Sequence, residues 1–317
     1  MFERARPRTE GALPDYIPQL SRVSPDFWAT SVCTIDGECL DLGDADVGFC
    51  AQSCCKPLNY CMALEETGEA NVHAHVGREP SGRGYNDLAL NFENKPHNPM
   101  INAGAIMTCS LIRPHLPMAD RFDAVLAQWE HASSAKVGFD NAVFLSERQT
   151  ADRNFALGYL MREHRVFPAG TDLLQTLEFY FMCCSIEVTT KSMAALAGTL
   201  ANGGVNPLSQ KRVLEPRTVR NCLSLMSSCG MYDFSGEFAF TVGLPAKSGV
   251  AGGILVVIPN VLGMATWSPL LDTYGNSVRG LAMCRDLVSV YNFHNYDSLT
   301  GLSGKEDPRT RVRTTEA

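Results

Sequence analysis

The sequence of 317 residues predicts a mixed α/β fold of the α+β type, with one antiparallel sheet built from both chain ends and an inserted helical lobe. Two observations predict this layout. Apolar, β-branched segments typical of strands occur from residue 27 to 52 and again from residue 238 to 272. The stretch between them has the apolar spacing of helices, and a further helix closes the chain. Strands at both ends join most simply in a single sheet.

The first strands are expected as a hairpin followed by a short third strand. Asp36-Gly37 is a dipeptide that favours a tight hairpin turn. The three predicted segments are residues 27–35, 38–43 and 47–52.

Helical periodicity then begins at Ser53 and ends near Gly68. Pro57 fits this helix because it lies in the first turn, where no N–H is needed. The helices that follow cover residues 101–112, 121–134, 152–164, 171–185, 191–204 and 216–230. Strands return at residues 238–249, 252–260 and 262–272, before a terminal helix at residues 276–295.

The two chain ends differ from the middle in composition. Both are polar and rich in arginine, so we expect a flexible N-terminal arm and a disordered C-terminal tail. The predicted boundaries are 1–13 for the arm, 14–298 for the folded unit, 14–52 with 236–298 for its sheet part, 53–235 for its helical lobe, and 299–317 for the tail.

Composition excludes several classes of function. An apolar share of 45% and a charged share of 19% describe a globular chain with enough material for a core. The net charge of -7 argues against binding nucleic acid or anionic membranes by bulk charge. No apolar run approaches the length of a transmembrane helix, so we expect no membrane insertion.

The cysteine count is unusual, at 12. None of these residues is spaced C-x-x-C, and most have apolar neighbours, which indicates buried small hydrophobes in a reducing compartment. His73-x-His75 can place two imidazoles on one strand face, but no third ligand is near in sequence. We therefore expect no metal site and no cofactor.

Ser53-Cys54-Cys55-Lys56 is an S-x-x-K motif at the predicted strand-to-helix junction. Residues three apart share a helix face, so the Lys56 amine can reach the Ser53 hydroxyl and activate it as a nucleophile. The first-turn amide of Ser53 can bind an oxyanion. Two alternatives remain: Ser53 caps the helix beside a surface lysine, or Cys54 or Cys55 is the nucleophile.

Lys247-Ser248-Gly249 supports the catalytic interpretation. A K-[ST]-G triad lies beside the S-x-x-K serine in penicillin-recognising enzymes. The small residues that follow allow a substrate to approach the backbone. The alternative is a glycine turn between strands.

Long segments identify a resemblance to a known family. They are DYIPQL (15–20), FCAQSCCKPLNY (49–60), HVGREPSG (75–82), KPHNPMINAGAI (95–106), SERQTADRNFALGY (146–159), FYFMCCSIEVT (179–189), NCLSLMSSCGMYDFSGEFAF (221–240) and LPAKSGVAGGILVVIPNVLGMATWSP (244–269). Together they closely resemble the serine-dependent glutaminases, above all the animal phosphate-activated enzymes, over residues 14–298. The resemblance implies a fold related to the serine β-lactamases and DD-peptidases, and the hydrolysis of L-glutamine to L-glutamate and ammonia.

Catalytic roles follow from the resemblance, motif by motif. It implies Ser53 as nucleophile, Lys56 as its base and Tyr232 as the group that passes a proton to the leaving ammonia. The amides of Ser53 and Val250 would form the oxyanion hole. Lys247 would either tune the field around the nucleophile or fix its strand.

Substrate contacts are implied in the same way. Glu147 would bind the α-ammonium group of glutamine. Asn102, Asn154 and Tyr180 would hold its α-carboxylate by neutral hydrogen bonds. Tyr16 and Gln52 would contact the side-chain amide and close the pocket.

The resemblance also implies regulation and assembly. The animal enzymes are activated by phosphate or similar anions and work as homotetramers, dimers of dimers, in mitochondria. Residues 82–94 match their activation loop, but Asp87 stands where those enzymes carry Lys and Ala89 where the kidney type carries Phe, whereas Tyr85 is closer to the liver type. Anion activation and inhibitor sensitivity are therefore open. We expect a tetramer, and a mitochondrial or otherwise cytoplasmic location.

Two other functions compete with glutamine hydrolysis. One is acyl transfer of the β-lactamase or DD-peptidase kind, against which Glu147 and the missing S-D-N motif argue. The other is a catalytically silent relative that acts as a subunit or binding module, against which the set of Ser53, Lys56 and Tyr232 argues.

Overall fold

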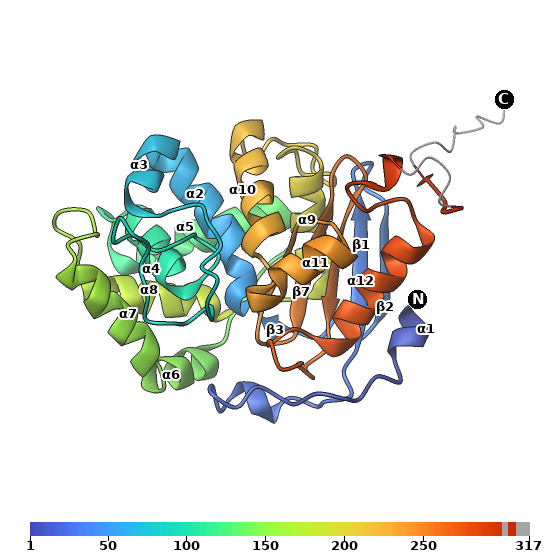
Figure 1. The fold of residues 1–317 in the computed structure, drawn as a ribbon, viewed down its shortest axis with the longest axis horizontal. Coiled ribbons are helices and arrows are strands. Elements are labelled where there is room, and N and C mark those ends of the chain that lie inside the picture. Colours follow the sequence, from blue (N-terminus) through green and yellow to red (C-terminus); the bar gives the residue numbers. More distant parts are fainter. Residues whose placement is uncertain (300–303, 309–317) are drawn as a thin grey trace.

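The computed structural model describes residues 1–299 and 304–308 (Figure 1). Strands from the two chain ends meet in a five-stranded antiparallel sheet of order β2-β1-β8-β7-β6. These strands are β1 Ala29–Thr34, β2 Cys39–Gly43, β6 Ala246–Ser248, β7 Gly253–Ile258 and β8 Leu262–Trp267. The joint is the pairing of β1 with β8, which sets Ala29 opposite Trp267. The predicted mixed fold with an antiparallel sheet from both ends is confirmed.

Both faces of this sheet are covered by helices. Helix α9 (Thr190–Ala201) packs on one face, and α11 (Ser235–Thr241) and α12 (Val278–Val290) cover the other (Figure 1). Strand β7 is buried at every position because its alternate side chains enter two different cores. Its sequence is therefore continuously apolar rather than alternating.

Helix α9 approaches the sheet closely at a pair of glycines. A Cβ atom on Gly263 of β8 would lie 2.1 Å from the backbone nitrogen of Gly198. Only glycine permits this contact between helix and strand.

The helical lobe lies beside the sheet, and the chain enters it after β2 and returns from it to β6 (Figure 1). Its helices are α2 Lys56–Thr67, α3 Glu69–His75, α4 Asn102–Leu111, α5 Met118–Ser133, α6 Asn141–Gln149, α7 Asp152–Glu163, α8 Leu173–Cys184 and α10 Pro216–Cys229. The helices expected in this part of the chain are present, and each end lies within three residues of its predicted position. Helices α3 and α6 were not predicted.

A second sheet corrects the predicted boundary between the sheet part and the lobe. Strand β3 (Phe49–Cys50) does not join the main sheet. It pairs with β5 (Ile186–Val188), which also pairs with β4 (Gly138–Phe139). The lobe therefore begins before the predicted residue 53, and short-range patterns could not show this because the strand partner lies far along the chain.

Two local predictions are wrong. Residues 238–241 were expected in a strand but belong to helix α11, where Phe238 is buried against α12 residues. His73 and His75 lie on helix α3 instead of a strand. The His73 ring is hydrogen-bonded to the Tyr60 hydroxyl and the Val76 carbonyl, and the His75 ring is hydrogen-bonded to the Val166 carbonyl.

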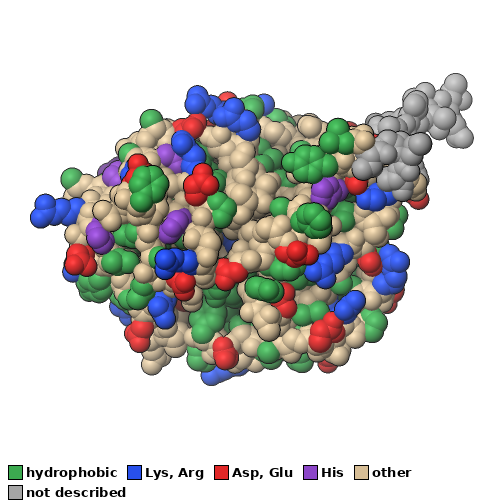
Figure 2. Space-filling model, viewed as in Figure 1, with side chains coloured by type: hydrophobic (Ala, Val, Ile, Leu, Met, Phe, Trp, Pro, Cys, Tyr) green, Lys and Arg blue, Asp and Glu red, His purple; other side chains and the backbone are tan. Residues whose placement is uncertain are grey.

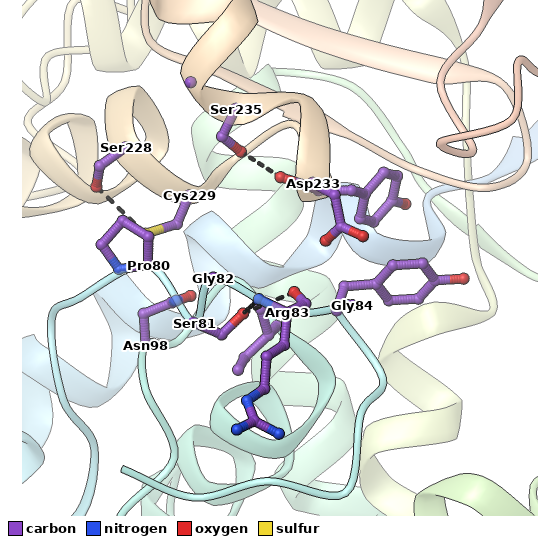
Figure 3. A pocket seen from close by; sticks show the side chains of 14 residues that line it. Pro80, Ser81, Gly82, Arg83, Gly84, Asn98, Ser228, Cys229, Asp233 and Ser235 are labelled. Atoms are coloured by element: carbon purple, nitrogen blue, oxygen red, sulfur yellow. Dashed lines mark hydrogen bonds between the residues drawn. The ribbon is translucent and has the colours of Figure 1, made fainter. Parts of the chain in front are cut away.

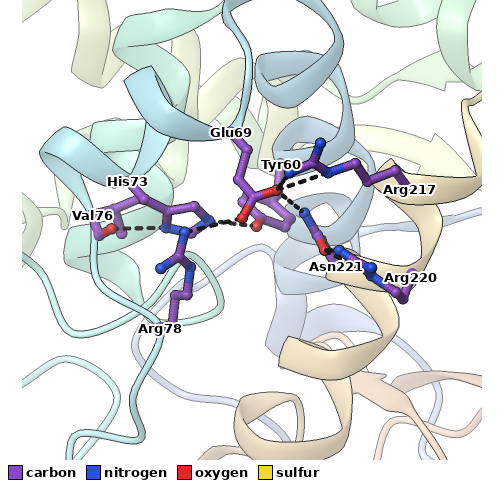
Figure 4. Close-up of polar contacts among 8 residues, drawn as sticks. All are labelled: Tyr60, Glu69, His73, Val76, Arg78, Arg217, Arg220 and Asn221. Carbon is purple, nitrogen blue, oxygen red and sulfur yellow. Dashed lines mark hydrogen bonds and ion pairs between the residues drawn. The ribbon is translucent and has the colours of Figure 1, made fainter.

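A polar cluster fixes helix α3 against helix α10 (Figure 4). The Glu69 carboxylate pairs with Arg78 at 3.2 Å and with Arg217 at 2.9 Å, and it accepts a hydrogen bond from Asn221 at 3.0 Å. These partners lower the pKa of Glu69. The cluster is largely exposed, so its role is to orient α3 rather than to supply much stability.

The N-terminal residues differ from the predicted flexible arm. They form helix α1 (Phe2–Ala5), which lies beside α12 (Figure 1). The Phe2 ring stacks on Trp28 at 5.1 Å, and the indole N–H donates to the Phe2 carbonyl. The Arg279 guanidinium donates to the Arg6 carbonyl. The predicted C-terminal tail lies mostly outside the described residues.

The surface and the helices bear on the predicted partners. On the face shown in Figure 2, basic and acidic side chains are interspersed, unlike the basic surface typical of a nucleic-acid binder. Within residues 1–299 and 304–308, no helix is long and apolar enough to cross a membrane.

The Phe2 anchor can be tested by substitution. Phe2→Ala should lower the free energy of unfolding by about 3 kcal/mol, because it leaves a cavity over a fully buried tryptophan. Chemical denaturation measures this loss. Arg8→Ala, at an exposed ion pair with Glu10, is the matched control and should change stability by less than about 0.5 kcal/mol. Equal, small losses in both variants would show that the arm is not anchored.

Candidate active site

Ser53 lies at a sharp turn between a strand and a helix, as the sequence predicts. Strand β3 runs into the short 3-10 helix η2 (Gln52–Cys55), and α2 begins at Lys56. Gln52 has a positive φ of 47°, a conformation that non-glycine residues rarely adopt. Strain of this kind persists where the surroundings hold it. Here the Gln52 side-chain amide donates to the Glu147 carboxylate at 3.1 Å, and both side chains are buried.

The Lys56 ammonium is buried and bound by one amide. Its Nζ donates to Asn102 Oδ1 at 2.7 Å. The same oxygen accepts from the Tyr180 hydroxyl at 3.3 Å, while the Asn102 NH₂ donates to Asn154 Oδ1 at 3.0 Å. Asn102 therefore joins residues of helices α2, α4, α7 and α8 in one network. Within the described residues, Lys56 makes this bond rather than one to Ser53.

Burial shifts the acid–base properties of Lys56. Removal from water lowers the pKa of its ammonium, and the neighbouring Cys184, Cys55 and Glu147 oppose this shift only in part. A lysine with a lowered pKa has a larger neutral fraction near pH 7 and can accept a proton.

Glu147 is a buried carboxylate close enough to Lys56 for the two charges to interact. It lies on helix α6 and is 4% exposed. Burial raises its pKa to about 7, although the Gln52 amide and the Lys56 charge favour the ionised form. A buried carboxylate with no paired cation is unusual and is ready to receive one.

Tyr232 lies beside Ser53 but in a strained conformation. It begins the 3-10 helix η3 (Tyr232–Phe234) with a φ of 55°. Its hydroxyl is buried and has no hydrogen-bond partner among the described residues. Burial and the neighbouring Tyr85 raise its pKa well above the ordinary value, while the Ser53 hydroxyl acts in the opposite direction. Tyr232 therefore keeps its proton near neutral pH and can donate it.

Lys247 lies against the ring of Tyr232. Its Nζ lies 4.5 Å from the centre of the Tyr232 ring, and it donates to the carbonyls of Gly230 and Ser248 at 3.1 Å and 2.7 Å. Complete burial and the Lys56 charge lower the pKa of Lys247 to about 7. Its charge near neutral pH is thus partial. Lys247 thus bonds backbone carbonyls and lies over the Tyr232 ring, an arrangement compatible with either role that the sequence left open.

Val250 reaches the site because the chain after β6 packs on η2. A Cβ on Gly249 would lie 2.8 Å from the Ala51 carbonyl and 3.4 Å from the Cys54 nitrogen. Glycine at this position lets the Val250 segment lie against the Ser53 turn. Both amide-bearing residues, Ser53 and Val250, are buried.

One cavity brings most of the predicted substrate residues together. Its volume is about 50 Å³. The predicted residues that line it are Tyr16, Gln52, Ser53, Asn102, Glu147, Asn154 and Tyr180. Tyr16 is 45% exposed at the rim, while burial of its hydroxyl near Tyr85 and Glu147 raises its pKa well above the ordinary value.

Sequence reasoning did not assign several other lining residues. They are Ile17, Tyr85, Asn86, Thr150, Ala151 and Arg153. Arg153 directly precedes Asn154, so its place in the same motif was the available signal. Tyr85 lies in the 82–94 loop, and its ring centre is 4.5 Å from that of Tyr232.

A larger cavity adjoins the first at these two tyrosines. It has a volume of about 400 Å³ and lies between residues 80–85 and the end of helix α10 (Figure 3). Tyr85 lines both cavities. Asp233 also lines the larger cavity, and burial together with the charge of Asp87 raises its pKa. The 82–94 loop therefore forms part of the wall of both spaces.

The glutaminase family model matches residues 11–296. The chain belongs to the glutaminase family.

Relatives of this family member span animals and bacteria. The chain is 56% identical to the putative glutaminase 3 of Caenorhabditis elegans over 99% of its length and 54% of that protein. It is 51% identical to the mitochondrial liver isoform of Rattus norvegicus over 98% of its length and 52% of that protein. The chain thus spans about half the length of these relatives.

Solved structures of glutaminases show the same fold. Mglu in its glutamate form superposes with a TM-score of 0.87 and 35% identity, covering 92% of this chain and 67% of that one. The fold of this glutaminase-family chain is therefore that of the serine β-lactamases, as the resemblance implied.

The raised pKa of Glu147 predicts a pH dependence of stability. Native Glu147 retains a proton that the unfolded chain releases between about pH 4.5 and 7, so its contribution to stability falls as the pH rises through that window. Glu147→Gln removes this contribution. Relative to wild type, the variant should gain about 3 kcal/mol between pH 4.5 and 8.

Urea denaturation at several pH values measures this difference. Glu163→Gln, an exposed position on helix α7, is the control and should differ from wild type by a constant amount. A constant difference for Glu147→Gln as well would contradict the raised pKa.

Proposed function

We propose that this chain hydrolyses L-glutamine to L-glutamate and ammonia through an acyl-enzyme on Ser53. One observation carries the proposal: Ser53 and the buried carboxylate Glu147 line one small cavity, and Asn102 of the same cavity binds the buried amine of Lys56. A serine with a buried lysine nearby suits attack on an amide, and the carboxylate suits the ammonium of a free amino acid. The names of the relatives and the glutamate form of Mglu support the same substrate.

The acylation step uses three side chains. The neutral Lys56 amine takes the proton of Ser53, whose oxygen attacks the side-chain amide carbon of glutamine. The oxygen of that amide becomes negative and is bound by the amides of Ser53 and Val250. Tyr232, a neutral phenol, gives its proton to the leaving nitrogen, and the Lys56 ammonium then returns a proton to Tyr232. Ammonia leaves, and a glutamyl ester remains on Ser53.

Deacylation reverses these roles. Water loses a proton to Lys56 and attacks the ester carbon, while the same two amides bind the oxyanion. The bond to Ser53 breaks, Ser53 regains its proton, and glutamate is released.

Substrate selection follows from charge and burial. Glu147, bonded to Gln52, would pair with the α-ammonium, and the ligand's charge would favour the ionised carboxylate. Asn102, Asn154 and Tyr180 would bind the α-carboxylate, with Arg153 at the rim of the cavity. Tyr16 would cover the bound amide. The buried Glu147 carboxylate favours a substrate with a free ammonium group over a β-lactam.

Assembly, activation and location are further parts of the proposal. We infer a homotetramer, a dimer of dimers, and a mitochondrial location by likeness to the liver isoform. The reaction needs no cofactor in this scheme. Phosphate or a similar anion would act through the 82–94 loop, because that loop forms the wall beside Tyr232.

Substitution of the nucleophile tests the reaction. Ser53→Ala should lower ammonia release from glutamine by at least about 10⁴-fold, since alanine cannot form the ester. A coupled glutamate dehydrogenase assay with and without phosphate measures the rate. Asparagine is the substrate control.

Cys54→Ala is the matched control for this site. Its thiol is buried next to Ser53, and burial raises its pKa to about 12, so it should remain protonated and inert. We expect Cys54→Ala to stay within about tenfold of wild type. Full activity of Ser53→Ala together with loss of activity in Cys54→Ala would show that Cys54 is the nucleophile. A folded wild type without ammonia release would favour the silent-subunit alternative.

The role of Glu147 predicts a pH-dependent substrate affinity. Because its pKa is about 7 in the empty site, the KM for glutamine should rise as the pH falls below 7, where the carboxylate is protonated. Steady-state kinetics from pH 6 to 8.5 measure this. In Glu147→Gln, KM should be high and nearly independent of pH. If the KM of this variant equalled that of wild type, the proposal that Glu147 binds the α-ammonium group would be contradicted.

A further inference from the structure

The first hairpin carries two cysteines at facing positions, and nothing in the proposed reaction uses them. We propose that Cys33 and Cys39 are a redox site. A low-molecular-weight disulfide such as glutathione disulfide would oxidise the two thiols to a reversible cross-strand disulfide between them. The inference is independent of the glutaminase reaction, because it concerns the edge of the main sheet farthest from Ser53.

Register places the two thiols together. Cys33 of β1 is the direct partner of Cys39 of β2 in the antiparallel pair. The Thr34 N–H donates to the Glu38 carbonyl at 2.8 Å, so residues 34 and 38 are a hydrogen-bonded pair. The next pair along, Cys33 with Cys39, is therefore of the non-hydrogen-bonded kind. In such pairs the Cα atoms are about 4.5 Å apart and the side chains lie on one face, within the range that a disulfide spans.

The two thiols differ in access to solvent. Cys39 is exposed on the edge strand β2, whereas Cys33 is 1% exposed, packed under α9 near Gly198. Burial and the neighbouring Cys39 raise the pKa of Cys33 to about 12. Cys39 is therefore the thiol that an external disulfide meets first, and Cys33 is placed to complete the exchange.

The chemistry balances in two exchange steps. The Cys39 thiolate attacks one sulfur of glutathione disulfide, which forms a mixed disulfide and releases one glutathione. The Cys33 thiolate then attacks the Cys39 sulfur, forms the Cys33–Cys39 bond and releases the second glutathione. The two cysteine thiols are oxidised, and one glutathione disulfide is reduced to two thiols.

Selectivity follows from the burial of the other cysteines. All 12 cysteines are free thiols, and Cys39 alone among them is exposed, while the other members are buried. Cys54 and Cys55 lie beside Ser53 with less than 1% of their surface exposed. A polar oxidant that does not unfold the protein should therefore react at Cys39 first.

The expected consequence is local stabilisation. Strand β2 pairs only with β1 in the main sheet and is otherwise held by contacts such as the ion pair of Asp41 with Lys191. A covalent link between Cys33 and Cys39 would hold the edge strand β2 to β1. The sheet order sets β2 at one edge and β6, which packs on the Ser53 turn, at the other, so the link should leave the catalytic site unchanged.

Peptide mapping tests the site directly. The folded wild-type protein is incubated with glutathione disulfide, its remaining thiols are blocked, and it is digested with an endoproteinase that cuts before aspartate. Such cleavage separates residues 26–35 from residues 36–40, and each of these peptides holds one of the two cysteines. We expect the two peptides linked in mass spectra, and separated after reduction.

Two variants test the two exchange steps separately. Cys39→Ser should show no linked peptide, and Cys33→Ser should retain glutathione on Cys39, because the resolving thiol is missing. Oxidised wild type should melt roughly 2–5 °C higher than reduced wild type, with no rise in Cys39→Ser. Glutathione left on Cys39 of the wild type, or disulfides formed through other cysteines, would contradict the proposal that Cys33 and Cys39 form the disulfide. A linked peptide with no rise in melting temperature would overturn the role of the link in holding β2 to β1.

Discussion

The buried ammonium of Lys56 is the constraint around which the helical lobe is arranged. A charge removed from water must be given partners, or it must lose its proton. Lys56 has one strong partner, the Asn102 oxygen, and the charge of Glu147 nearby. Asn102 begins helix α4 and is itself bonded to Asn154 and Tyr180, which belong to α7 and α8. The same network that satisfies the lysine therefore fixes three helices around the cavity and leaves the amine short of full solvation, which is what a base for Ser53 needs.

The main sheet adds the other half of the site through one close contact. Gly249 directly follows strand β6 and packs on the backbone of the Ser53 turn, and this contact brings Val250 and the Lys247 strand to the site. Lys247 then supports the ring of Tyr232, which is held at a positive φ. The two residues with strained backbones at the site, Gln52 and Tyr232, are thus held from opposite sides, one by the lobe and one by the sheet. Strain is concentrated where catalytic side chains must point into the cavity.

The sequence predicted those parts that short patterns encode. The S-x-x-K motif at a strand-to-helix junction, the glycine after Lys247 and the apolar run of β7 each carry local signals, and the resemblance supplied the distant residues of the cavity. The rest depended on partners far along the chain. Strand β3 has the same local pattern as β1, yet it pairs with residues 186–188. Residues 238–241 have strand-like composition, but burial of Phe238 against α12 favours a helix. The arm looked polar, yet Phe2 meets a tryptophan whose position no local pattern gives.

The cysteines show how burial decides the chemistry of one residue type. Cys54 follows the nucleophile directly, but its thiol is enclosed, donates to the carbonyls of Lys247 and Gly253, and has its pKa raised to about 12. A thiol in that state stays protonated and packs like a small apolar side chain. Ser53 therefore remains the proposed nucleophile, although two cysteines follow it directly in the sequence. At the opposite edge of the sheet, exposure reverses the outcome, because Cys39 meets solvent and faces a second thiol. The same fold thus keeps thiol chemistry away from the catalytic turn and permits it at the edge strand.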